Sequence, residues 1–331
     1  MPRVSSSYRA PFLLRNAHLH TVYPTLTRKV HGVVYTRERL ELLDGDFLDL
    51  DWFRHGGGCR LAILCHGLES GSGAQYMRGM TQFLSDQGWD VLALNYRGCS
   101  GEENRLPRSY HSGATEDLDA VLGHVQGMDR YSQVALVGFS LGGNLVLKYL
   151  GEGRPLAAQV KVAACVSVPC DLASSAERLG SWRCRMYMRS FAKSLKEKLL
   201  RKSERFPGVF CEGVGEPVRS FAEFDHWYTA PAHGFLSAQD YWARCSSRPH
   251  LPGVRVPTLL LNAQDDPFLP NACYPEEEAV GNRFLHLETP QHGGHLGFVG
   301  SRRDSSYWHE ARIGQFFSSF ETPAKARFWR R

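Results

Sequence analysis

The fold of this chain is decided by one stretch of sequence, SQVALVGFSLGGNLVLKYL (residues 132–150). Its first half is a short apolar run, which is typical of a buried β-strand, and its second half predicts a helix that ends at the glycines of 151–153. The GFSLG sequence (138–142) joins the two halves. A serine on a tight turn between a strand and a helix projects its hydroxyl above the sheet, so Ser140 is the candidate nucleophile.

Strands and helices alternate on both sides of this stretch. We expect strands at 60–67, 89–98, 132–140 and 160–169, helices at 73–87, 115–126 and 141–150, and a β-hairpin within 33–53. Strands that alternate with helices predict an α/β fold with a mostly parallel sheet and helices on both faces.

The alternation of strands and helices stops late in the chain and then resumes. Residues 171–252 show a mainly helical pattern, after which strands are expected at 256–262 and 282–288 and a final helix at 305–320. We therefore predict a core formed by residues 1–170 and 253–331. Residues 171–252 would form a helical cap or lid that is inserted between two strands.

A serine nucleophile needs a general base, and the base needs a carboxylate that fixes its tautomer. Folds with this turn place them in the chain order serine, acid, histidine. Asp265 and Asp266 follow the strand at 256–262, and either could be the acid. His292 and His295 compete for the base in a glycine-rich loop. We favour His295, because glycines on both sides leave room for the backbone to approach.

Backbone N–H groups are expected to hold the oxyanion of such a reaction. One belongs to Leu141, directly after the serine, and the other should follow an early strand. Leu68 occupies that place, although its loop could also be a simple turn at the end of a strand. No cysteine or carboxylate completes a ligand set with the paired histidines, so we expect neither a metal nor another cofactor.

Composition limits the class of protein. The 331 residues include 39 Lys and Arg against 34 Asp and Glu, a net charge of +5, which is ordinary for a globular protein and does not indicate nucleic acid binding. No apolar run of 18 residues and no apolar leader region occur, so we expect no transmembrane span and no secretory signal. Nine cysteines without a CxxC pair indicate reduced thiols and a cytoplasmic protein.

The positive charge is concentrated in residues 181–206, which hold nine Lys or Arg and two Glu. The apolar residues of this segment recur at steps of three or four and are Cys184, Met188, Phe191, Leu195 and Leu199. This spacing predicts an amphipathic helix with a basic outer face. The simpler interpretation is a solvated helix over a core. The alternative is a peripheral contact with an anionic membrane or an anionic substrate.

Several motifs in a fixed order give the chain a family resemblance. They are Asn16 to Thr21, His66 to Leu68 with Tyr76, Asn95 to Gly101, Tyr110 to Gly113 followed by Asp117, Gly138 to Asn144, Asp265 to Phe268 and Gly293 to Phe298. Over nearly its whole length the chain resembles the YheT-like branch of the α/β-hydrolases, whose relatives include mammalian α/β-hydrolase-domain lipases and yeast ethanol acyltransferases. His20 departs from the pattern, where the family more often has Gln.

The resemblance implies the α/β-hydrolase fold and a serine hydrolase of carboxylic esters. It favours Asp266 as the acid, because Asp-Pro-x-x-Pro is similar to the acid loop of these enzymes, and Asp265 would then support the loop. We expect hydrolysis of short-chain, medium-chain or lipid-like esters through an acyl-enzyme on Ser140. The alternatives are an alcohol O-acyltransferase with the same three residues and a non-catalytic binding protein. The physiological substrate and the oligomeric state stay open.

Overall fold

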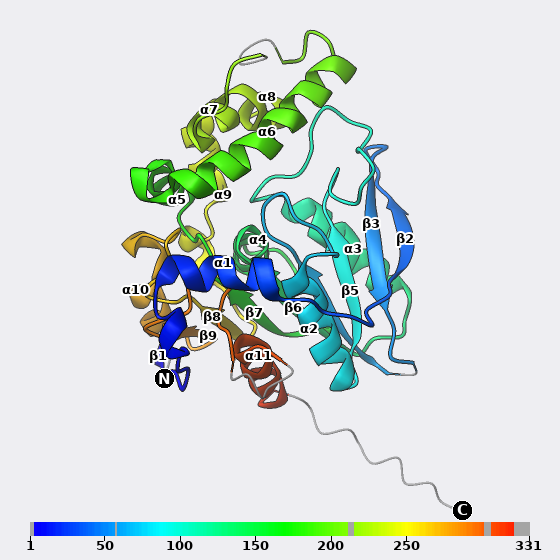
Figure 1. Cartoon of the computed structure of the whole chain (residues 1–331). Coiled ribbons are helices and arrows are strands. Elements are labelled where there is room, and N and C mark those ends of the chain that lie inside the picture. Colours follow the sequence, from blue (N-terminus) through cyan, green and yellow to red (C-terminus); the bar gives the residue numbers. More distant parts are fainter. Residues whose placement is uncertain (1–2, 57, 211–214, 301–305, 321–331) are drawn as a thin grey trace, which may run out of the picture.

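The structure is a computed structural model that describes residues 3–56, 58–210, 215–300 and 306–320. These residues build one nine-stranded sheet in the order β1-β9-β8-β7-β6-β4-β5-β3-β2. The strands are β1 (Arg3–Val4), β2 (Thr36–Glu41), β3 (Phe47–Phe53), β4 (Arg60–Cys65), β5 (Asp90–Asn95), β6 (Gln133–Phe139), β7 (Val160–Val166), β8 (Thr258–Leu261) and β9 (Leu285–Glu288). Only the β2–β3 and β3–β5 pairs are antiparallel, so the predicted mostly parallel sheet is confirmed (Figure 1).

Helices cover both faces of this sheet, as the alternating pattern predicts. They are α2 (Gln75–Asp86), α3 (Thr115–Gly127), α4 (Leu141–Gly151), α10 (Glu276–Gly281) and α11 (Trp308–Ser318). The core also has helix α1 (Ala17–Thr27) and the short 3-10 turns η1 (Phe12–Leu14) and η5 (Asn271–Cys273). On β4, Leu61 and Ile63 pack with α3 and α4, whereas Ala62 and Leu64 pack with α2 and α11. All four side chains are fully buried, which explains why β4 is a continuous apolar run in the sequence.

The described residues between β7 and β8 form mainly helices and turns. They are α5 (Leu172–Gly180), η2 (Trp182–Cys184), α6 (Arg185–Arg205), α7 (Phe221–Phe224), the π-helical turn η3 (Asp225–Thr229), α8 (Ala230–His233), α9 (Ala238–Cys245) and η4 (Arg248–Gly253). We call residues 171–252 the cap segment. It has an apolar cluster of its own, and Figure 1 shows α5 to α8 gathered above α1 and α4. The division of the chain at 170 and 253 into core and cap stays a prediction.

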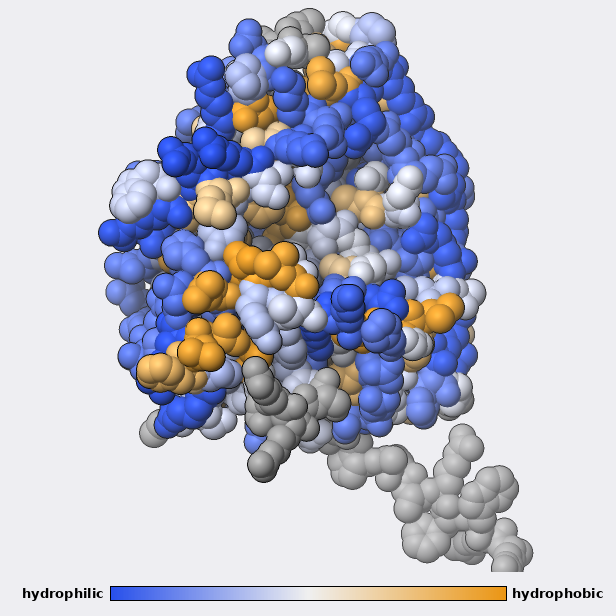
Figure 2. Space-filling view, viewed as in Figure 1, coloured by the Kyte–Doolittle hydropathy of each residue, from blue (hydrophilic) through white to orange (hydrophobic). Residues whose placement is uncertain are grey.

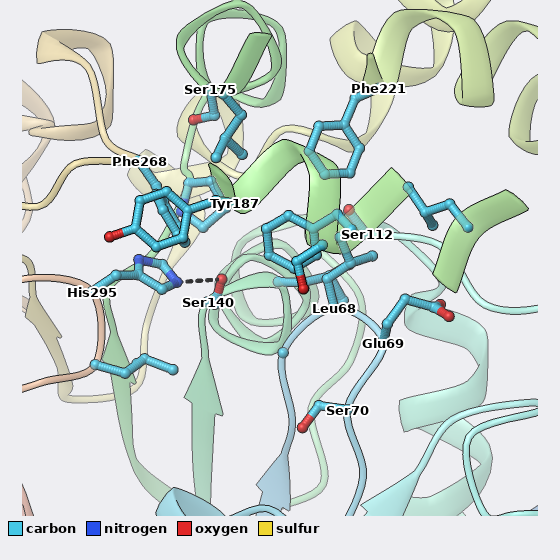
Figure 3. Close-up of a pocket in the computed structure, with 18 of the residues that line it drawn as sticks. Leu68, Glu69, Ser70, Ser112, Ser140, Ser175, Tyr187, Phe221, Phe268 and His295 are labelled. Atoms are coloured by element: carbon cyan, nitrogen blue, oxygen red, sulfur yellow. Dashed lines mark hydrogen bonds between the residues drawn. The ribbon is translucent and has the colours of Figure 1, made fainter. Parts of the chain in front are cut away.

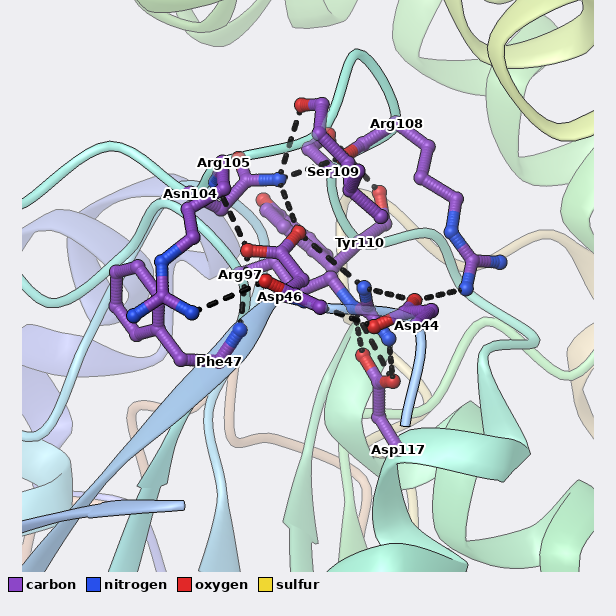
Figure 4. Close-up of polar contacts among 12 residues, drawn as sticks. Asp44, Asp46, Phe47, Arg97, Asn104, Arg105, Arg108, Ser109, Tyr110 and Asp117 are labelled. Carbon is purple, nitrogen blue, oxygen red and sulfur yellow. Dashed lines mark hydrogen bonds and ion pairs between the residues drawn. The ribbon is translucent and has the colours of Figure 1, made fainter. Parts of the chain in front are cut away.

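The buried guanidinium of Arg97 joins the loops beside β5 (Figure 4). It donates to both carboxylate oxygens of Asp117 at 2.6 and 2.9 Å and forms ion pairs with Asp44 at 2.7 Å and Asp46 at 3.2 Å. Asn104 adds a 2.7 Å hydrogen bond to Asp46. This cluster fixes the loops against which the cap segment rests, because charges removed from water persist only when they are paired.

Two elements at the start of the chain were absent from the sequence prediction. β1 is only two residues long and pairs with β9, almost three hundred residues away in the chain. α1 begins after Asn16, whose side chain accepts hydrogen bonds from the N–H groups of His18 and Leu19. The helix also contains Pro24, a residue that ordinarily argues against a helix.

Candidate active site

The serine turn lies between β6 and α4, where the sequence places it. Ser140 has φ +52°, a left-handed conformation that a non-glycine residue adopts only under constraint. A Cβ at Gly142 would lie 2.3 Å from the carbonyl oxygen of Cys65, and one at Gly138 would lie 2.4 Å from the oxygen of Gly142. Gly142 is therefore required for the turn to pack against β4, and Gly138 for the close approach of β6 to the start of α4.

The structure brings the three predicted side chains into one hydrogen-bonded chain. His295 Nε2 lies 3.0 Å from Ser140 Oγ (Figure 3), and His295 Nδ1 lies 2.9 Å from Asp266 Oδ2. The Asp266 side chain is fully buried. Because an ionised carboxylate only accepts hydrogen bonds, Nδ1 carries the proton of the neutral ring. Nε2 is then free to accept the proton of Ser140.

The second Asp–His pair is separate. Asp265 Oδ2 lies 3.2 Å from His292 Nδ1, and its Oδ1 accepts a 2.9 Å hydrogen bond from the N–H of Gly294. Burial raises the pKa of Asp265 above its ordinary value. The two adjacent aspartates thus point in different directions. Asp265 holds the histidine loop, and Asp266 faces the ring of His295.

Helix α1 positions the histidine loop, a role that the sequence did not reveal. The N–H of His295 donates to Thr21 Oγ1 at 2.9 Å, and a Cβ at Gly294 would lie 2.8 Å from the carbonyl oxygen of Ala17. On the other side, the N–H of Leu296 donates to Ser167 Oγ at 3.0 Å. The Asn16 to Thr21 motif was the available signal for this contact, because it lies outside the alternating strands and helices.

Register places the two candidate oxyanion donors near each other. β4 and β6 are parallel neighbours in which Cys65 pairs with Gly138, so the loops after both strands emerge at the same edge. A Cβ added at Gly67 would lie 3.4 Å from Ser140 Cβ. Leu68, Leu141 and Ser140 line one cavity, as Figure 3 shows for Leu68 and Ser140. Both leucines therefore lie on the wall of the cavity that Ser140 also lines.

His66 supports this loop and is not a second base. Its ring is fully buried, and Nδ1 donates to the carbonyl oxygen of Gly67 at 2.7 Å. Nε2 accepts a 3.3 Å hydrogen bond from the N–H of Tyr96. Burial lowers the pKa of His66 to about 4. The ring is consequently neutral near pH 7, and both of its nitrogens are occupied by backbone groups.

The cavity above Ser140 has a volume of about 590 Å³. Core and cap segment both contribute to its wall, and the cap side is mainly apolar: Leu172, Leu179, Tyr187, Phe191, Phe221 and Trp242. Phe268 packs on His295 with 4.3 Å between ring centroids. Apolar walls around a few convergent polar groups are typical of a site for a small organic ligand.

A buried ion pair connects the cap segment to the loop of Leu68. Lys198 of α6 pairs with Glu69, whose side chain is 14% exposed and accepts a 2.7 Å hydrogen bond from Tyr110 Oη. Burial opposes ionisation of Glu69, but the nearby ammonium and the hydrogen bonds outweigh it and lower the pKa of this carboxyl. Lys198 also lies 4.5 Å from the centroid of the Tyr110 ring.

This pair corrects the predicted basic outer face of residues 181–206. The apolar spacing was right, because Cys184, Met188, Leu195 and Leu199 are buried. Lys198 and Lys202, however, are also buried. Lys202 Nζ donates to Asn104 Oδ1 and to the carbonyl oxygen of Leu106, both at 2.7 Å. Two of the nine cations are therefore buried against the core, and Arg201 and Arg205 also reach it, at Glu103 and at the carbonyl oxygen of Asn104.

The described residues offer no cluster of metal-ligating side chains and no membrane-spanning helix. No group of three or more His, Cys, Asp and Glu side chains within the described ranges is placed to hold a metal ion. Across the same ranges, no helix combines the length and apolar character that a membrane span needs.

A serine on a strand-to-helix turn, joined to a histidine and a buried aspartate at the carboxyl edge of a mostly parallel sheet, defines the class of α/β hydrolases. Residues 62–300 match the family model described as the alpha/beta hydrolase fold. The chain belongs to this family, and within it to the YheT-like branch of esterase- and lipase-type members.

Individual relatives agree with this assignment. The chain is 35% identical over 312 residues to the putative esterase YheT of Escherichia coli K12, covering 92% of this chain and 91% of that one. It is 31% identical to phospholipase ABHD3 of Mus musculus, covering 83% and 69% of the two chains. An esterase of Pyrococcus furiosus matches in structure with a TM-score of 0.58, 18% identity and coverage of 89% and 97%, which shows the shared fold. The predicted family and fold are confirmed.

Proposed function

We propose that this protein hydrolyses carboxylic esters through an acyl-enzyme on Ser140. One observation carries the proposal: the hydrogen-bonded chain from Asp266 through His295 to Ser140 opens directly into the cavity. A serine hydroxyl is a weak nucleophile until an adjacent base removes its proton. The 3.0 Å separation of His295 Nε2 and Ser140 Oγ is suited to that transfer.

The reaction would proceed in two halves. Ser140 Oγ attacks the ester carbonyl while His295 Nε2 takes its proton, and Asp266 stabilises the imidazolium that forms. The N–H groups of Leu68 and Leu141 would hold the oxyanion of the tetrahedral intermediate. His295 then returns the proton to the departing alcohol. Water attacks the acyl-enzyme with His295 again as base, which releases the acid and restores Ser140.

The lining of the cavity supports an ester with an apolar acyl group. Leu172, Phe191, Phe221 and other cap side chains surround the space near Ser140, and charged side chains are few. Two relatives bear the names phospholipase and monoacylglycerol lipase, which fits the same chemistry. We therefore infer short-chain, medium-chain or lipid-like esters as substrates.

The test is hydrolysis of a p-nitrophenyl ester series of increasing acyl length. Ser140→Ala should abolish turnover, while the thermal unfolding of the variant stays like that of the wild type. Retained turnover in this variant would refute the proposal. A second assay adds a primary alcohol and analyses the products. It distinguishes a hydrolase from an acyltransferase, because a transferase yields the new ester in place of the free acid.

A further inference from the structure

An unusual number of apolar side chains is exposed at the start of the chain. We call them the apolar ridge: Phe12, Leu13, Leu19, Val22, Tyr23 and Leu26. Thirteen large apolar side chains are exposed in the described part of the chain, and these six come from η1 and α1 alone. Leu19, Tyr23 and Leu26 are spaced four and three residues apart, which places them on one face of α1. A cluster of this kind marks an interaction site, whereas scattered exposed residues do not.

A second exposed group lies at the beginning of α6. Trp182 and Met186 are 80% and 81% exposed. The cations of the same region, which we call the basic rim, are Arg183, Arg185, Arg189 and Lys193. All four are exposed, and within the described residues none of them forms an ion pair with a carboxylate. The basic rim differs in this respect from Lys198 and Arg201, which pair with Glu69 and Glu103.

The ridge and the rim flank the opening of the cavity. Val22 of the ridge lines the cavity, as does Tyr187 of α6. His18 of α1 stacks on Tyr187 with 5.8 Å between ring centroids, and its Nδ1 lies 3.1 Å from the tyrosine Oη. Figure 2 shows hydrophobic residues over α1, a hollow beside them, and hydrophilic residues over α6 beyond it. The apolar and cationic groups therefore lie on one face, around the entrance to Ser140.

We propose that this face docks onto the surface of an anionic lipid assembly. The apolar ridge would enter the boundary between headgroups and acyl chains, and the basic rim would contact anionic headgroups, as amphipathic interfacial helices do. The orientation brings the cavity entrance to the lipid, so that a lipid-like ester reaches Ser140 without crossing water. The delivery of an ester to Ser140 rests on the proposed ester hydrolysis, but the docking of the protein on lipid can be measured without any turnover.

The experiment is sedimentation of the full chain with vesicles of equimolar phosphatidylglycerol and phosphatidylcholine, and with phosphatidylcholine alone. The wild type should bind the anionic vesicles more tightly. Leu19→Ser with Leu26→Ser should weaken binding at least tenfold. Arg185→Glu with Arg189→Glu should weaken binding to the anionic vesicles alone, by more than tenfold, because each basic residue near such a surface contributes about fivefold.

The matched control is Leu43→Ser with Leu236→Ser, two leucines outside the ridge that are more exposed than Leu19 and Leu26, and this variant should bind like the wild type. Hydrolysis of a soluble p-nitrophenyl ester is measured on the same preparations and should be unchanged in every variant. Wild-type protein that stays in the supernatant, or ridge variants that bind like the wild type, would overturn the docking even if the esterase activity is present. Wild-type binding that depends on the ridge, without any ester hydrolysis, would support the docking and refute the proposed function.

Self-association gives the remaining outcome. If the wild type is a dimer and Leu19→Ser with Leu26→Ser makes it monomeric, the ridge is an interface between two copies. That result, read by light scattering in the absence of lipid, would overturn the lipid proposal. We expect the same oligomeric state for the wild type and the ridge variant.

Discussion

Replacement of Lys198 by methionine tests the connection between α6 and the loop of Leu68. Methionine keeps the unbranched apolar stem and removes the ammonium. The Glu69 carboxylate, which is 14% exposed in the wild type, is then left with Tyr110 as its remaining side-chain partner. Removal of one member of a buried ion pair costs about 3–5 kcal/mol, because the other charge stays buried. Since Glu69 keeps the tyrosine hydrogen bond, we expect the lower end, about 3 kcal/mol of unfolding free energy.

The assay is urea denaturation of Lys198→Met, Glu69→Gln and the double variant, followed by far-UV circular dichroism. The double variant should lose less unfolding free energy than the two single variants lose together, because no charge is then left unpaired. The control is Arg201→Met on the same helix, whose pair with Glu103 is largely exposed and should contribute less than about 1 kcal/mol. Loss of the Lys198 ammonium should also lower kcat, because Glu69 adjoins Leu68.

Acid gives an independent check of the same pair. The pKa of Glu69 is lowered in the folded state, so its contribution to stability is present above the ordinary glutamate pKa and is lost as the pH falls through the folded value. The difference in stability between the wild type and Lys198→Met should therefore shrink in acid. A loss below about 1 kcal/mol at neutral pH, with no coupling in the double variant, would refute the reasoning.

Two further predictions concern the acids of the site. Burial raises the pKa of Asp225 to about 6, so the folded chain binds the proton more tightly than the unfolded chain. The unfolding free energy should therefore fall by about 2 kcal/mol as the pH rises from 4 to 6. Asp225→Asn should flatten this part of a pH series of thermal unfolding, and an unchanged slope would contradict the assignment. Asp266→Asn should lower kcat about 10⁴-fold on p-nitrophenyl esters with little effect on folding, because His295 is then held in the wrong tautomer. A decrease in kcat of less than tenfold would show that a residue other than Asp266 orients His295.

Local patterns were enough to predict the central sheet. The buried strands are apolar runs bounded by glycine or polar residues, and the turn at Ser140 follows from its glycines and its position between β6 and α4. The order of acid and base along the chain left two aspartates and two histidines as candidates. The family resemblance favoured Asp266 and the flanking glycines favoured His295, and the structure places these two in contact. These features depend on neighbours that are close in the sequence or on parallel strand order.

The remaining features depend on distant contacts. α1 contains Pro24, and its position depends on Thr21 meeting the N–H of His295 across most of the chain. Periodicity predicted an amphipathic helix with a basic outer face for residues 181–206. The inward direction of Lys198 is explained by Glu69, which lies 129 residues away, and by the ring of Tyr110. No local pattern contains such a partner.

The central claim is that Ser140 is the activated nucleophile of this chain. Its most direct test is reaction of the native protein with a fluorophosphonate, followed by mass spectrometry of the intact chain and its peptides. We predict one phosphonyl group per chain, located on Ser140, and its absence from Ser140→Ala. A folded wild type that takes up no label, or carries it on another residue, would contradict the claim.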